Sequence, residues 1–169
     1  MGVRVAAFGV MILLAILLKT TVLPAVAVAG FRPDVLVLVV VAIGLAEGPE
    51  SGVRVGFAAG LVQDLISGGS ALVGVGALVV MGAGYAAGRL RPYIAASAQT
   101  GPIVLSGGLT AAATAAFGML GRMFGTTEPT LGRVLVATLV VGLYSAVVSP
   151  LVLRPVRSVL RQFPPASAG

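Results

Sequence analysis

Two carboxylates, Asp34 and Asp64, are the side chains of this sequence best placed to do chemistry in apolar surroundings. Carboxylates buried in lipid are costly and often functional, and two that meet can act as an acid–base pair. Neither has the glycine context of an aspartic protease. We therefore expect Asp64 to lie at a membrane interface and to bond to loop amides around Gly68 or to Arg32. The alternatives are a contact with a protein partner and a polar site.

Other catalytic chemistry is limited by composition, because the chain has no His, Cys or Trp. Zinc, haem and iron–sulfur centres lose their usual ligands, and a Ser–His or Cys–His nucleophile pair cannot be assembled. The net charge of +6 comes from arginines scattered singly between apolar runs, which disfavours nucleic-acid binding. We expect no cofactor, no metal and no enzymatic activity.

The elements that carry these residues are apolar throughout. Of 169 residues, 58% are hydrophobic and 9% are charged, against roughly a quarter charged in soluble domains. The solvent for most of this chain must therefore be lipid. Glycine, with 24 residues, is about twice as frequent as usual.

Three uncharged stretches, 65–88, 92–121 and 134–153, reach the roughly 20 residues that a bilayer requires. We predict an all-α integral membrane protein, a six-helix transmembrane bundle that forms a single domain over 1–169. The predicted helices are about 5–27, 33–46, 51–67, 71–88, 101–121 and 131–152. The second and third form a tight hairpin whose arms are short for a full crossing, so they either thin the bilayer or are partly re-entrant.

The distribution of Lys and Arg predicts the orientation, because cytoplasmic loops carry more of both. With both termini in the cytoplasm of a multi-pass inner-membrane protein, the inner side holds the larger share: Arg4, Arg54, Arg89, Arg91, Arg154, Arg157 and Arg161, against Lys19, Arg32, Arg122 and Arg133. A rival interpretation makes the first segment a signal peptide that is cleaved after the small residues 27–29.

Glycines spaced by four residues form the clearest packing motif. Gly52, Gly56 and Gly60 place three positions without side chains on one helix face, and Gly84 and Gly88 repeat the spacing. Such faces let helix backbones approach closely in lipid. The strip either packs inside this bundle or serves as a docking surface for another membrane protein.

The end of the chain has a periodic pattern after Pro155. Val156, Val159, Leu160 and Phe163 fall on one side of a helix and Arg157 and Arg161 on the other. We expect a short basic amphipathic helix over 155–163 that lies on an anionic leaflet, with Arg154, Arg157 and Arg161 at the membrane surface. The alternatives are a simple stop-transfer cluster and a contact with a cytoplasmic partner.

Three stretches in this order resemble the rod shape-determining protein MreD family: Gly30-Phe31-Arg32-Pro33-Asp34 before a valine-rich run, residues 56–65 (GFAAGLVQDL), and residues 84–91 (GYAAGRLR). The resemblance implies a fold like the S component of energy-coupling-factor transporters. It implies a component of the cell-elongation machinery for peptidoglycan synthesis, partnered with MreC and, through it, with MreB and a RodA/penicillin-binding protein. Pro33, Asp34, Phe57 and the segment from Gly56 to Asp64 would then be a structural signature.

We therefore predict a non-catalytic inner-membrane scaffold that acts by helix packing with an MreC-like protein. The alternative is a vitamin-binding subunit of a membrane transporter, which would need polar and aromatic side chains that converge in a pocket. Aromatic residues make up only 5% of the chain, and Tyr85, Tyr93 and Tyr144 suit interface anchors better. A third possibility, an intramembrane enzyme or a flippase-like protein, rests only on Asp64 and on buried Arg and Asp side chains.

Overall fold

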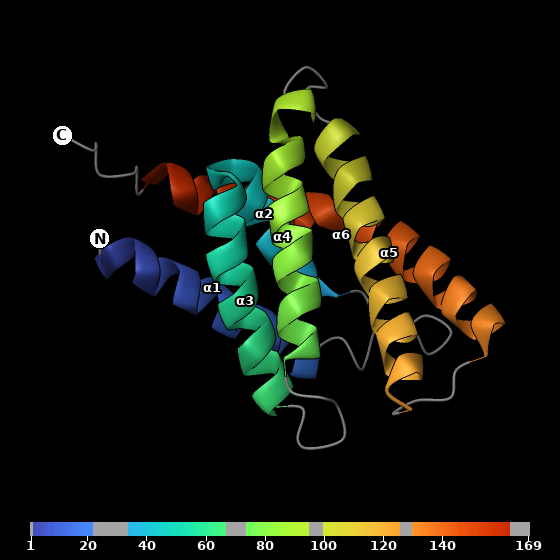
Figure 1. Ribbon diagram of the computed structural model, residues 1–169. Helices are drawn as coiled ribbons and strands as arrows, with labels where there is room; N and C mark the ends of the chain where they lie inside the picture. Colours follow the sequence, from blue (N-terminus) through green and yellow to red (C-terminus); the bar gives the residue numbers. More distant parts are fainter. Residues whose placement is uncertain (1, 22–33, 67–73, 95–99, 126–129, 163–169) are drawn as a thin grey trace.

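The computed structural model describes residues 2–21, 34–66, 74–94, 100–125 and 130–162. Regular structure in these segments is entirely α-helical (Figure 1). The elements are α1 (Gly2–Thr21), α2 (Val35–Glu47), α3 (Pro49–Ile66), α4 (Val75–Ile94), α5 (Thr100–Met123) and α6 (Leu131–Gln162). The predicted all-α class is confirmed over the described residues.

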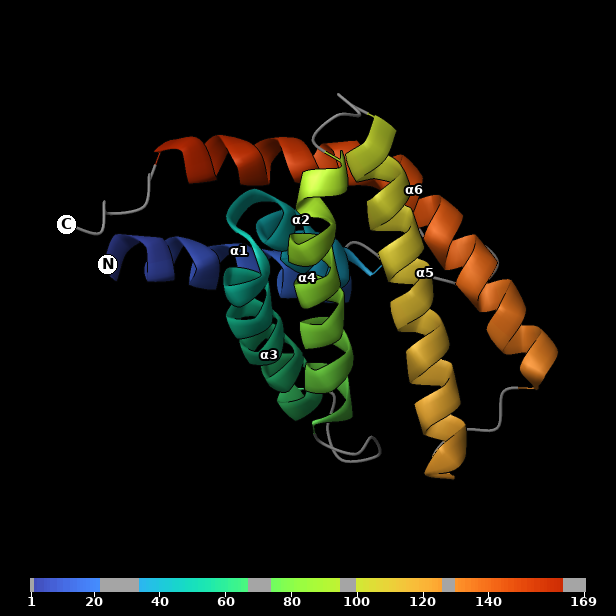
Figure 2. The same ribbon diagram turned by 45° about the horizontal axis from the view of Figure 1, so that its top comes forward.

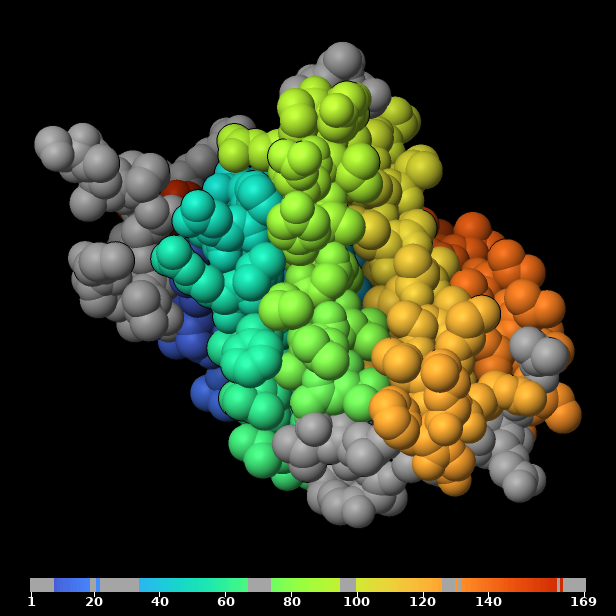
Figure 3. All heavy atoms as spheres, in the orientation of Figure 1, coloured from blue at the N-terminus to red at the C-terminus, as the bar shows by residue number. Residues whose placement is uncertain are grey.

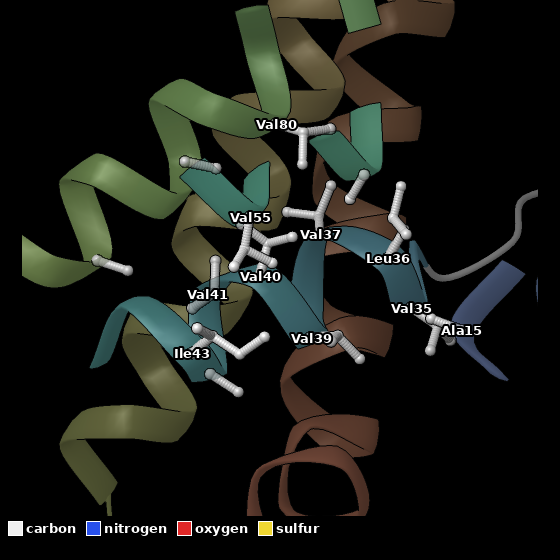
Figure 4. Packing of buried hydrophobic residues seen from close by; sticks show 14 of the residues in the cluster. Ala15, Val35, Leu36, Val37, Val39, Val40, Val41, Ile43, Val55 and Val80 are labelled. Atoms are coloured by element: carbon white, nitrogen blue, oxygen red, sulfur yellow. The ribbon is translucent and has the colours of Figure 1, made fainter. Parts of the chain in front are cut away.

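Helix α2 forms the centre of the molecule. Every residue from Val35 to Leu45 is buried, and α2 contacts each of the other five helices. Its side chains project in several directions into the core, where Val35 lies next to Ala15 of α1 (Figure 4). A helix that is apolar on all sides is expected to be enclosed.

Helix α2 is short for a membrane crossing. Its 13 residues span only about 20 Å at 1.5 Å per residue. The other five helices surround it. That the arm expected over 33–46 thins the bilayer or is partly re-entrant stays a prediction, because it depends on this length relative to the roughly 30 Å of hydrocarbon.

Helices α3, α4 and α5 stand side by side and cover one face of the molecule (Figures 1 and 3). Gly48, with a φ of +100°, ends α2, and its N–H donates to the carbonyl of Gly44 at 2.8 Å. A positive φ is a conformation that glycine adopts without strain. The chain turns sharply there, and α3 begins at Pro49, where a missing N–H costs nothing.

Helix α4 is longer than expected. The sequence predicts an end at residue 88, before the basic pair Arg89 and Arg91, but the helix continues through Pro92 to Ile94. Ile94 packs against the hydrophobic core. This apolar contact stabilises the additional turns, while Arg89 to Tyr93 remain exposed.

The predicted break between a helix over 131–152 and a tail over 155–163 is wrong. Residues Leu131–Gln162 form one helix that contains Pro150 and Pro155, and Figure 2 shows it changing direction along its length. Proline removes one backbone hydrogen bond and bends a helix. The helix continues past both prolines because Leu153 and Val156, each 5% exposed, pack in the core.

Two helical segments are long and apolar enough to cross a membrane, Thr100–Met123 and Gly132–Leu160. Helix α1 begins and α6 ends on the same side of the molecule in Figures 1 and 2. The last turns of α6 and the last turns of α1 both contribute to the core around α2, through Val156 and Ala15 among others.

Candidate functional site: the seam between α3 and α4

The glycines of α3 lie directly against α4. A Cβ added to Gly56 would be 2.8 Å from the Cα of Met81, and one added to Gly60 would be 2.5 Å from the Cα of Ala77. Gly52 meets the backbone of Gly84 even more closely. Any side chain at these positions would push the two helix backbones apart, so the glycine strip is occupied by an internal contact.

The glycines of α4 complete the seam. Gly84 faces the backbone of Gly52 and the side chain of Val40, and Gly88 faces the turn at Gly48 and Pro49. Close packing therefore extends along α3 and into the turn that precedes it. In lipid, such backbone contact supplies the dispersion and weak hydrogen-bond energy that hold helices together.

Asp64 lies at the other end of this seam, where α3 ends and α4 begins. Its side chain is 8% exposed, and its Oδ2 accepts hydrogen bonds from the backbone N–H groups of Gly74 at 2.8 Å and Ala77 at 3.2 Å. The first N–H groups of a helix lack intrahelical partners and favour negative charge. Asp64 of α3 therefore caps α4 across the intervening loop.

Sequence reasoning expected loop amides as partners of Asp64 but placed them around Gly68. The observed donors lie farther along the chain, at the start of α4, and Gly68 and Arg32 are outside the described residues. Gly74, with a φ of +105°, directs its N–H to the carboxylate. The available signal was the Gly74-x-Gly76 spacing, which by itself indicates a turn and a flexible entry to a helix.

Gly76 is a site residue that sequence reasoning missed. A Cβ at this position would collide with the carboxylate of Asp64. The glycine thus makes room for the carboxylate to reach the amides of Gly74 and Ala77. A small residue at the second position of α4 is a condition for the cap.

Asp34 caps a different helix, α2. It precedes α2 as its N-cap, and its Oδ1 accepts from the N–H of Val37 at 3.4 Å. The sequence predicted Asp34 inside the first turn after Pro33, which is outside the described residues. An aspartate one residue before the helix is better placed to accept a first-turn amide.

The remaining predicted residues lie away from this seam. Phe57 is 47% exposed on the outer side of α3. Arg154 and Arg157 are exposed on the last turns of α6, and Arg161 lies on the same helix. The structure does not bring these side chains together with Asp64.

The contacts described along this seam hold the two helices together. The carboxylate of Asp64 is held by two amides, and the glycines contact backbone. No group of three or more acidic side chains suited to a metal ion occurs among the described residues.

The model of one protein family, rod shape-determining protein MreD, matches residues 3–163. The chain belongs to the MreD family. The match extends well beyond the stretches 30–34, 56–65 and 84–91, so the second half of the chain belongs to the family pattern too. Membership assigns a role in rod-shape determination, and with the two long apolar helices it indicates a membrane protein. Neither the curated proteins nor the solved structures contain a match.

Proposed function

We propose that this MreD-family protein is a non-catalytic inner-membrane scaffold of the cell-elongation machinery. It acts by helix packing with an MreC-like protein and, through it, with MreB and the RodA/penicillin-binding protein that synthesise peptidoglycan. The observation that carries the proposal is the family match over residues 3–163. A rigid bundle around a fully enclosed α2 supports a packing role.

The partner surface in this proposal is an outward helix face. The glycine strip of α3 already contacts α4, so it has no free surface to offer. Helix α6 presents a continuous apolar ridge at a four-residue spacing, from Leu135 through Leu139, Leu143 and Val147 to Leu151, with each side chain more than half exposed. Large apolar faces of this kind are compatible with lipid and with another transmembrane helix.

The proposed topology has six spans and both termini in the cytoplasm. Arg54, Arg89 and Arg91 lie at the end of the bundle where the α2–α3 turn meets the end of α4. Arg122, at the end of α5, and Arg133, at the start of α6, lie at the opposite end (Figure 1). This separation agrees with the positive-inside rule. A reporter fused after residue 169 tests it, and an extracytoplasmic signal would refute it.

Deletion of the gene with complementation tests the scaffold itself. We expect cells without the protein to lose their rod shape, and a tagged copy to restore it and to co-purify with an MreC-like protein. Normal cell width in the deletion strain would refute the proposal. A thermal-shift panel of vitamins tests the alternative of a transporter subunit, for which a specific stabilising vitamin is the expected sign.

Two matched variants locate the contact. Leu139→Ala combined with Leu143→Ala removes the middle of the α6 ridge, where both side chains are 72% exposed. Leu13→Ala combined with Leu17→Ala removes comparable exposed leucines from α1. If α6 carries the contact, only the first pair lowers co-purification while both proteins accumulate normally in the membrane.

A further inference from the structure

The last turns of α6 expose positive charge without any carboxylate nearby on the same helix. Arg154 and Arg157 are exposed, and the segment Leu131–Gln162 contains no Asp or Glu. The arginine at the α2–α3 end differs, because Arg54 forms an ion pair with Glu50 at 3.4 Å. The end of α6 is therefore a cationic surface whose own helix supplies no counter-charge.

Three apolar side chains of these turns face the protein. Leu153 and Val156 are buried in the core, and Leu160 packs against it. Among the side chains that the structure describes in the last turns, the exposed ones are Arg154, Pro155, Arg157, Ser158 and Gln162. This arrangement corrects part of the amphipathic interpretation of 155–163, since Val156 and Leu160, two of the residues expected to face the leaflet, contact the protein's own core. Phe163 lies outside the described residues.

We propose that Arg154 and Arg157 bind the headgroups of anionic phospholipids and that charge alone provides the attraction. Basic segments beside a membrane-spanning helix are attracted to anionic lipid, whether the charge is carried by Lys or by Arg. Without apolar insertion, salt screens the attraction. The proposal does not depend on the scaffold function.

Headgroup binding at this surface also stabilises the fold. The turns that carry Arg154 and Arg157 contribute Leu153 and Val156 to the core that includes residues of α1 and α2. A ligand that binds only the folded state raises its stability. Anionic lipid is therefore expected to raise the melting temperature of the whole bundle.

The test uses the purified full-length protein in a neutral detergent, with phosphatidylglycerol or phosphatidylcholine added. We expect phosphatidylglycerol to raise the melting temperature and phosphatidylcholine to leave it unchanged. Salt at about 1 M, where the Debye length is about 3 Å, should abolish the rise. Native mass spectrometry should show retained phosphatidylglycerol under the same low-salt conditions.

Matched variants show where the anionic lipid binds. The double variant Arg154→Gln, Arg157→Gln should reduce the phosphatidylglycerol-induced rise in melting temperature by at least half. The double variant Arg154→Lys, Arg157→Lys should retain most of that rise. Arg122→Gln with Arg133→Gln removes the same charge from exposed positions at the other end and should keep the full rise.

If the two glutamine pairs lose equal parts of the phosphatidylglycerol-induced rise in melting temperature, the proposal is overturned. A rise in melting temperature that survives high salt would also overturn it. A polyglutamate peptide that stabilises the protein more than phosphatidylglycerol would also overturn it, in favour of an acidic protein partner. If the first glutamine pair does not fold, the single variants Arg154→Gln and Arg157→Gln decide the question: each should retain less phosphatidylglycerol than the Arg122 and Arg133 pair at low salt, and equal retention would overturn the proposal.

Discussion

Gly52 and Gly84 lie backbone to backbone where α3 passes α4, so that a Cβ on either residue would collide with the carbonyl of the other. The relationship is reciprocal, and neither helix can adjust alone. Close approach of this kind holds together a bundle whose helices gain no hydrophobic driving force from lipid.

Gly84→Ala should destabilise the protein, whereas Gly82→Ala should not. The added methyl group at position 84 meets backbone atoms of Gly52, while the space around position 82, on the same helix, is open. Alanine favours a helix over glycine by about 1 kcal/mol, so Gly82→Ala is expected to be neutral or stabilising. Thermal unfolding in detergent measures both changes. Similar losses for the two variants would mean that the seam is not where the structure places it.

Asp64→Ala should lower the free energy of unfolding by about 1–3 kcal/mol, because it leaves one buried and one partly buried amide donor without their acceptor. Those donors are the N–H groups of Gly74 and Ala77. Glu50→Gln is the control, since its ion pair with Arg54 is highly exposed and such pairs contribute about 0–1 kcal/mol. An effect of Asp64→Ala no larger than that of the control would contradict the cap.

Gly76→Ala should be much more destabilising when Asp64 is present than when it is replaced. The methyl group would collide with the carboxylate of Asp64, so removing that carboxylate should relieve most of the effect. A double-mutant cycle with Asp64→Ala measures this coupling, which for residues in contact is about 0.5–3 kcal/mol. Additive effects would show that the two positions do not interact.

Leu36→Ala should cost about 2–5 kcal/mol, the usual range for emptying a core position. Leu36 is fully buried in α2, whereas Leu139 on α6 is 72% exposed. Leu139→Ala should therefore change stability by no more than about 0.5 kcal/mol. Chemical unfolding of the two variants in the same detergent distinguishes an enclosed α2 from one that faces solvent, for which both costs would be small.

Sequence patterns identified the helices better than their ends or their neighbours. The turn after Glu47 and the glycine strip of α3 follow from Gly, Pro and the four-residue spacing. The ends of α4 and α6 were missed because Ile94, Leu153 and Val156 gain core contacts that override the local signals of charge and proline. Asp64 was correctly expected to bond to backbone amides, but which amides depends on where α4 begins.

The sequence by itself determined that the chain is helical and apolar, that its glycines form a packing face, and that it resembles the MreD family. Only the tertiary structure decided that this face contacts α4, that α2 is enclosed by the other five helices, and that the apolar side of the last turns of α6 belongs to the core. The physical reason is that lipid and protein interior are both apolar. Hydropathy therefore predicts which residues avoid water, and packing determines which of them meet lipid and which meet one another.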